Sequence, residues 1–343
     1  QNKRDGLLIL PRYDHSISMP IVDVIDLINF KTIHTYQYNL SQIVDKSSIK
    51  LEYYHPLILD DGSLISEGTY TPLFKVDFYS NLKWVNNEIV FHHSKTLDHE
   101  NNILIPGRLK PHSKLVKLYQ HPIENFRDDA IIKINSDGKI LYKKSVIEIL
   151  IENKIGDMIN KLKKTVSDPI HLNCIEPALS DTEHWKKGDV FLSLKHHSAI
   201  VLYRPNTNKV IDYITGPFAH QHDVDIVSKN EISIFNNNNF FIDNKYSEVL
   251  IYNFETKKFK KIFNDQLKKE NFKTYSSGMS QILNDGALMV EEENHGRIIL
   301  FNKMGEKEWE FVNKDNDGNI GEISWSRIIE DKSFIEKFKL LVD

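Results

Sequence analysis

The sequence predicts an all-β fold, a six-bladed β-propeller, from a repeated hairpin and its period. Six segments share an apolar run, a polar turn and a second run with an aromatic or aliphatic residue, and they begin near residues 21, 73, 131, 200, 249 and 298. Such runs around Gly, Asn, Asp or Ser are typical of β-hairpins. The starts are separated by 52, 58, 69, 49 and 49 residues. A period of about 50 residues with four strands per repeat indicates a propeller blade.

A second hairpin half aligns between the repeats, at residues 61–66, 101–106, 188–193, 230–235 and 285–290. An array of β-sandwiches is the alternative that the same strands allow. We find no linker between independent parts, so we expect a single domain, residues 1–343.

Two stretches interrupt the repeat. From Ser145 to about Lys164, apolar residues recur at spacings of three and four, which predicts an inserted amphipathic helix. Ser145 can cap this helix, and Glu148 completes a capping box. The other stretch, Arg108 to Asp128, is expected to be a loop.

Composition excludes several classes of function. The chain has 343 residues, 40% of them apolar and 27% charged, as in an ordinary globular protein. A net charge of −4 argues against a nucleic-acid-binding protein, which usually has a basic excess. Cys174 is the single cysteine, which excludes an internal disulfide, a four-cysteine zinc site and a Cys-x-x-Cys redox motif.

The sequence also bears on membrane and targeting segments. No window approaches the roughly 18 consecutive apolar residues that a membrane-spanning helix needs. The chain begins at Gln1 without Met or a signal peptide, so we expect a mature or truncated form.

Histidines recur shortly before the second hairpin half in four consecutive repeats. They are His55, His93, His171 and His222. Blades are related by rotation about the propeller axis, so equivalent positions form a ring. This ring faces the central channel if the histidines start the innermost strands. A single histidine is more often structural, but four at one repeat position predict a shared functional site.

The residues that end the second strands give a second ring, which contains Arg108, Lys195 and Asn237. Neutral imidazoles, cationic side chains and an amide suit an anionic group with several oxygens, such as sulfate or phosphate.

Several motifs resemble the arylsulfotransferase family of bacterial six-bladed propellers. They are His171-Leu-Asn173, Phe191-Leu-Ser-Leu-Lys-His-His-Ser-Ala-Ile200, Gly216-Pro217 with Gln221-His222-Asp223, and Phe235-Asn236-Asn237. The resemblance covers about residues 70 to 310, and the motifs occur in the family's order. Members of that family move a sulfuryl group from an aryl sulfate to a phenolic acceptor. They use no nucleotide sulfate donor and form a transient sulfohistidine.

The resemblance assigns roles to individual residues. His222 matches the nucleophilic histidine of the family's Gln-His motif, and His171 matches the histidine of its His-x-Asn motif. His93 matches the first channel histidine. Lys195 stands where the family has an arginine; it keeps the charge but loses the planar bidentate fork. We therefore expect His222, His171, His93 and Lys195 to be catalytic.

The remaining expectations concern substrate contacts and proton transfer. His55, Arg108, Asn173 and Asn237 are expected to contact the substrate. His171 or His93 can serve as both acid and base, because imidazole titrates near neutrality. Asp223 is a candidate for orienting an imidazole, although adjacent residues in a strand point in opposite directions.

The resemblance also implies partners and a location. The partners are a small-molecule sulfate donor and a hydroxyl acceptor, without nucleic acid, metal or cofactor. The family is typically periplasmic or membrane-anchored outside the cytoplasm, so an anchor beyond the given chain is allowed, as is a homodimer.

Two other functions stay open. One is a non-catalytic propeller that binds a glycan or a protein. The other is a metal-dependent oxygenase in which His55, His93, His171 and His222 hold the metal, since imidazole suits iron, copper and zinc. Residues 313–318 look like the start of a calcium loop, but Ser324 stands where a bidentate Glu is needed, which favours a polar turn.

Overall fold

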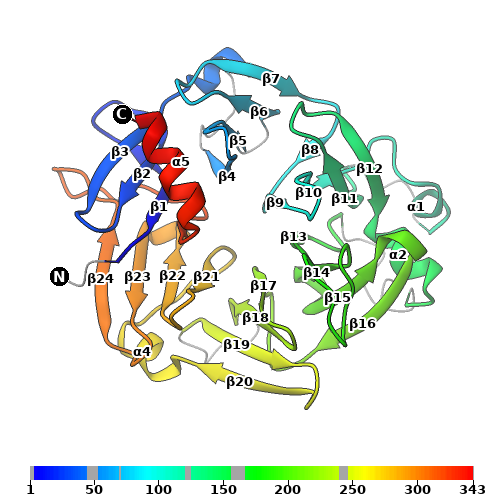
Figure 1. Ribbon diagram of the computed structural model, residues 1–343. Helices are drawn as coiled ribbons and strands as arrows, with labels where there is room; N and C mark the ends of the chain where they lie inside the picture. The colour runs from blue at the N-terminus through cyan, green and yellow to red at the C-terminus, as the bar shows by residue number, and fades with distance from the viewer. Residues whose placement is uncertain are drawn as a thin grey trace. The chain divides into compact units, whose positions relative to one another are not determined.

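The computed structural model is a six-bladed β-propeller and describes residues 4–44, 53–68, 71–119, 125–155, 167–238 and 246–342 (Figure 1). Over these residues the strands form six antiparallel sheets, five with four strands and one with five. The predicted fold is confirmed, and the sandwich array is not. The chain divides into two compact units, residues 1–87 with 263–343 and residues 88–262. The single-domain boundary stays a prediction.

The first unit, residues 1–87 with 263–343, contains three of the sheets. The strands of the first sheet are β1 (Leu7–Asp14), β2 (Met19–Asp26), β3 (Lys31–Tyr36) and β25 (Arg327–Ile329). The second sheet consists of β4 (Tyr54–Ile58), β5 (Leu64–Glu67), β6 (Leu73–Val76) and β7 (Leu82–Asn86). The third consists of β21 (Met279–Ile282), β22 (Leu288–Glu292), β23 (Arg297–Phe301) and β24 (Lys307–Val312). The helices are η1 (Leu40–Gln42), α4 (Asn264–Lys269), η4 (Glu293–His295) and α5 (Lys332–Val342).

Both ends of the chain contribute to one blade. Strand β25 pairs antiparallel with β1, and Leu8 lies opposite Ile328. Alternate residues of β1 and β2, among them Leu7 and Val22, enter a core that also receives Phe338 of α5. This alternation is what a strand with one face on the core requires, and it joins the N-terminal strands to the C-terminal helix.

The second unit, residues 88–262, also contains three sheets. The five-stranded sheet consists of β8 (Val90–Phe91), β9 (Thr96–Leu97), β10 (Ile103–Arg108), β11 (Asp129–Ile134) and β12 (Ile140–Ser145). The next sheet consists of β13 (Leu172–Pro177), β14 (Val190–Leu194), β15 (Ala199–Arg204) and β16 (Lys209–Thr215). The last consists of β17 (Val224–Ser228), β18 (Glu231–Asn236), β19 (Glu248–Asn253) and β20 (Lys258–Ile262). The helices are α1 (Lys114–Tyr119), α2 (Val146–Glu152), η2 (Lys195–His197) and η3 (Pro205–Thr207).

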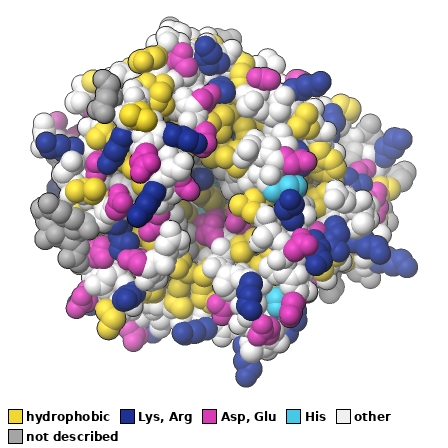
Figure 2. All heavy atoms as spheres, viewed as in Figure 1, with side chains coloured by type: hydrophobic (Ala, Val, Ile, Leu, Met, Phe, Trp, Pro, Cys, Tyr) yellow, Lys and Arg dark blue, Asp and Glu magenta, His cyan; other side chains and the backbone are white. Residues whose placement is uncertain are grey.

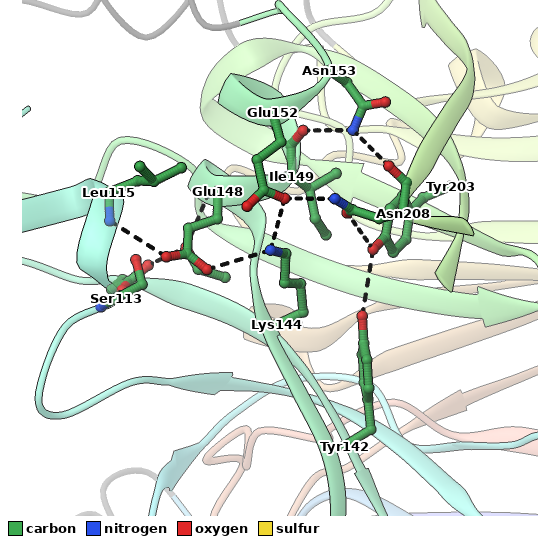
Figure 3. Close-up of polar contacts among 12 residues, drawn as sticks. Ser113, Leu115, Tyr142, Lys144, Glu148, Ile149, Glu152, Asn153, Tyr203 and Asn208 are labelled. Atoms are coloured by element: carbon green, nitrogen blue, oxygen red, sulfur yellow. Dashed lines mark hydrogen bonds and ion pairs between the residues drawn. The ribbon is translucent and has the colours of Figure 1, made fainter. Parts of the chain in front are cut away.

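The inserted helix is confirmed at its predicted start. The Ser145 hydroxyl accepts a hydrogen bond from the Glu148 backbone N–H at 3.3 Å, as an N-cap should. The Glu148 carboxylate lies 3.5 Å from the Lys144 ammonium and accepts from the Leu115 N–H at 3.4 Å (Figure 3). Helix α2 ends at Glu152 with Asn153 as its C-cap, earlier than expected. Residues 156–164 of the predicted helix lie outside the described residues.

Asn153, the C-cap of α2, bonds to the neighbouring sheet. Its side chain donates to the Asn208 carbonyl at 3.1 Å and accepts from the Val210 N–H at 2.9 Å. The Asn208 amide in turn donates to Glu152 at 2.6 Å (Figure 3). These contacts join the end of α2 to the turn between β15 and β16, while Ile149 packs in the core below.

The structure also bears on the predicted loop at residues 108–128 and on the predicted turn near Asp315. The stretch from Arg108 to Asp128 is not only a loop, because it contains α1. The Asp315 carboxylate accepts from the Asp317 and Asn319 N–H groups, which makes the polar turn that the sequence favours. Within the described ranges, no helix has both the length and the apolar character needed to cross a membrane.

We predict that Ser145→Ala lowers the free energy of unfolding by about 1–3 kcal/mol. The Ser145 hydroxyl caps α2 and also donates to the buried Asp128 carboxylate at 2.6 Å. The alanine removes both bonds and leaves a buried acceptor with one partner fewer. Denaturant titration measures the change, with the exposed Ser180→Ala as control. Equal stability of the two variants would contradict the prediction.

Candidate functional site

Three of the expected histidines converge in the second unit. The Nε2 atoms of His93 and His171 lie 3.3 Å apart, which is hydrogen-bonding distance. The His222 ring packs edge-on against His93, with ring centroids 5.4 Å apart and planes at 88°. His222 is buried, while His93 and His171 are partly exposed. One imidazole from each of three consecutive sheets therefore meets at one place.

The backbone explains how His93 and His171 are aimed. Both have a left-handed conformation, with φ of 63° and 53°. This conformation is uncommon for residues other than glycine, and such strained positions cluster at functional sites. It turns each chain sharply just before or within the first strands of its sheet.

The equivalent residue of the third sheet is His220 rather than His222. His220 has φ of 53° and its carbonyl accepts from the Asn237 side chain at 2.7 Å. In the preceding sheet, the His171 carbonyl accepts from the Lys195 N–H at 3.1 Å. His222 lies two residues further along, where its N–H donates to the Phe235 carbonyl at 2.9 Å. The predicted equivalence of His222 with His171 is therefore wrong by two residues, although the two rings come from neighbouring blades.

Asn173 holds the chain that carries His222. It is fully buried and donates to the Gln221 carbonyl at 3.1 Å. The Gln221 side chain in turn donates to the Ser193 hydroxyl at 3.2 Å and the Ala199 carbonyl at 2.9 Å. Asn173 thus fixes the backbone directly before His222, and its predicted contact with substrate stays a prediction.

His171 makes a second strong contact, with Asp168. The Asp168 carboxylate lies 2.7 Å from His171 Nδ1 and 2.7 Å from the Arg127 guanidinium. The Asp168 carbonyl also lies 2.6 Å from His196 Nδ1. Burial alone would raise the pKa of Asp168, but the His171 hydrogen bond and the neighbouring cations hold it well below its usual value. The carboxylate is therefore ionised at neutral pH.

Burial lowers the pKa of His171, and the nearby Lys195 lowers it further, although Asp168 acts in the opposite direction. Burial also lowers the pKa of His197 to about 4 and that of His220 to about 4. These three imidazoles are consequently neutral at pH 7. Figure 2 shows histidine only in small patches on the drawn face.

The two cationic residues have different surroundings. Lys195 starts η2 directly after β14 and is 8% exposed. The Arg108 Nε atom lies 3.6 Å from the buried Asp129 carboxylate, which also accepts from the Leu172 N–H at 2.8 Å. Arg108 is thus bound to the residue that anchors the start of β13, next to His171.

His55 belongs to the first unit. It is fully buried, has φ of 44°, and its ring centroid lies 4.0 Å from that of Trp325. The Tyr54 hydroxyl beside it donates to Glu293 at 2.9 Å. Its predicted contact with substrate stays a prediction.

Sequence reasoning missed Asp168, Arg127, His196 and His220. Asp168 had a visible signal, since it stands three residues before His171. The sequence suggests Asp223 as an acid that orients an imidazole, and this stays a prediction. The carboxylate that contacts His171 is Asp168.

Some of these residues are also candidates for ligands of a metal ion. In the described part of the chain, donor atoms of Asp168, His171 and His196 lie within 4.8 Å of one another. This group differs from the four histidines expected for an oxygenase. The distance of 2.7 Å between Asp168 and His171 Nδ1 is that of a hydrogen bond, and Arg127 already neutralises the carboxylate. These contacts favour a proton over a metal ion between the two side chains.

Several solved structures are similar to this chain. A protein of unknown function from Bacteroides caccae matches with a TM-score of 0.60 at 10% identity, over 96% of this chain and 100% of that one. An auxiliary nutrient binding protein from Bacteroides ovatus matches at TM-score 0.46 and 10% identity, over 90% of this chain and 75% of that one. Virginiamycin B lyase from Staphylococcus aureus matches at TM-score 0.42 and 12% identity, over 76% of this chain and 69% of that one. A search of curated protein sequences gave no match.

A family model provides the assignment. The model described as arylsulfotransferase (ASST) matches residues 62–314, about three-quarters of the chain. The matched range contains His93, His171, Lys195 and His222. The chain therefore belongs to the arylsulfotransferase (ASST) family.

Proposed function

We propose that the protein moves a sulfuryl group from an aryl sulfate-type donor to a phenolic or other hydroxyl acceptor, without a nucleotide sulfate donor. Family membership supports sulfotransferase activity in general. The observation that carries the finer proposal is the convergence of His93, His171 and His222 from three consecutive sheets.

His222 is the proposed nucleophile. A neutral ring nitrogen attacks sulfur, the N–S bond forms, and the S–O bond to the aryl group breaks. The aryl oxygen leaves as phenolate and takes a proton from an acid. The acceptor hydroxyl then loses its proton to the same group, attacks sulfur, and releases His222. Splitting the transfer in this way is covalent catalysis, for which ping-pong kinetics are diagnostic.

His171 and His93 are the proposed acid and base. Their Nε2 atoms are 3.3 Å apart, so the pair shares a proton and can give it up or take it back in each half-reaction. His171 lies next to both His93 and Lys195, which supports a site where proton transfer and charge neutralisation act together.

Lys195 is proposed to neutralise charge on the sulfuryl oxygens. A cation placed in a water-poor site acts most strongly where charge develops in the transition state. Lysine binds as a point charge, whereas arginine binds two oxygens at once. We also infer from the family a location outside the cytoplasm, which cell fractionation with an antibody would test.

We predict that His222→Asn abolishes transfer from p-nitrophenyl sulfate to an added phenol, with at least a 10³-fold loss expected of a missing nucleophile. The wild type, given radiolabelled sulfate donor without acceptor, should carry label on a histidine. The matched control is the exposed His99→Asn, which should keep its rate. Turnover that persists in His222→Asn would exclude this nucleophile. No wild-type turnover in metal-free buffer with several acceptors would contradict the proposed function.

We predict that kcat/KM falls in acid with an apparent pKa below 6.5. Burial lowers the pKa of His171, so its base form persists to lower pH than that of an ordinary histidine. Lys195→Gln removes a charge that lowers this pKa and should therefore move the acidic limb upward. The pH profiles of the wild type and the variant measure the shift. A downward shift in Lys195→Gln would contradict the assignment of this limb to His171.

A further inference from the structure

We propose that Asp168 is the positioning residue of His171, and that it holds the imidazole in the tautomer with the proton on Nδ1. This inference rests on the proposed sulfuryl transfer, in which His171 is the acid and base. The proton that His171 exchanges with substrate is then always the one at Nε2.

The hydrogen bond itself sets the tautomer. An ionised carboxylate can only accept, so at 2.7 Å from Asp168 the Nδ1 atom of His171 must be the donor. The surroundings keep the pKa of Asp168 well below its usual value, so the carboxylate stays ionised over the working pH range. Neutral His171 therefore presents a lone pair at Nε2.

Asp168 is held at both its side chain and its backbone. The Arg127 guanidinium donates to the same carboxylate at 2.7 Å, and the Arg127 N–H donates to the Ser167 carbonyl at 2.7 Å. The Asp168 carbonyl lies 2.6 Å from His196 Nδ1. The carboxylate is 13% exposed. A group fixed by several contacts and shielded from water can orient its partner, as outer residues do in other histidine-dependent sites.

The tautomer of His171 also determines that of His93. Two imidazole nitrogens 3.3 Å apart can share only one hydrogen. With a lone pair on His171 Nε2, His93 must donate from its own Nε2. The three side chains thus form one chain of hydrogen bonds, in which His93 donates to His171 and His171 donates to Asp168. A substrate hydroxyl that enters the site replaces His93 as the donor to His171.

The charges around His171 act in opposite directions. Asp168 and Asp129 raise its pKa, Lys195 lowers it, and burial lowers it most. The neighbouring groups that contact or face it are Asp168, Asp129, Lys195, His93, His196 and His220. Removing the Asp168 charge should therefore lower the His171 pKa further, whereas removing the Lys195 charge should raise it.

The test combines NMR with kinetics on the full chain. Long-range ¹H–¹⁵N spectra of histidine-labelled protein report which ring nitrogen of His171 carries the proton, with the signal assigned by its loss in His171→Gln. The wild type should show the Nδ1–H form, and Asp168→Asn should lose it and titrate at lower pH. An Nε2–H form in the wild type would overturn the inference without any variant.

In the kinetic experiment, Asp168→Asn should lower kcat/KM on the order of 10²–10⁴-fold. This is the loss expected when an amide replaces a carboxylate that orients a catalytic histidine. The acidic limb should move down, opposite to Lys195→Gln. Asp168→Glu, which keeps an accepting carboxylate, should recover part of the rate. The control is Asp137→Asn, a change of equal charge at an exposed turn of the same unit.

The two proposals fail in different ways. If the wild type transfers no sulfuryl group, the proposed function fails, while the NMR arm still reports on Asp168. If Asp168→Asn keeps both the tautomer and the wild-type rate within about twofold, the inference about Asp168 is overturned and the proposed function stands.

Discussion

The position of each histidine in the candidate site depends on strand β13, through hydrogen bonds from this strand to the chains on both sides. Toward the preceding sheet, the Ile175 N–H donates to the Ser94 hydroxyl at 3.1 Å, next to His93. Toward the following sheet, Asn173 donates to the Gln221 carbonyl at 3.1 Å, next to His222. Because His171 immediately precedes β13, one strand sets the spacing of all three rings.

This arrangement costs folding free energy that other contacts must offset. His93 and His171 both have left-handed backbones, which typically cost on the order of 1 kcal/mol or more each. Asp129 and Asp168 are carboxylates held largely away from water, where an unpaired charge is strongly destabilising. Each is compensated locally, Asp129 by the Leu172 N–H with Arg108, and Asp168 by Arg127. Such strain and burial are what a site needs in order to hold neutral imidazoles in fixed orientations.

Features of the fold that depend on a few neighbouring residues were predictable from the sequence, whereas features that depend on pairing between distant residues were not. The hairpin of β15 and β16 and its turn are encoded within a few residues, as is the Ser145 cap, so both were predictable. Which of His220 and His222 is equivalent to His171 was not predictable, because it depends on how Phe235 pairs across the sheet. The role of Asp168 also depends on Arg127, 41 residues away in sequence. Such pairings determine where side chains lie relative to one another. The number of residues between two motifs does not reveal these pairings.

The same pairings bear on whether the site suits an anion or a metal ion. A divalent cation would need carboxylates whose charge is available, but Asp168 is bound to Arg127 and Asp129 lies beside Arg108. The imidazoles of His171 and His220 are neutral because burial lowers their pKa values. An anion entering the site would meet neutral ring nitrogens and the cation of Lys195. The arginines that neutralise Asp168 and Asp129 therefore fit the proposed sulfuryl-type anionic substrate better than a bound metal ion.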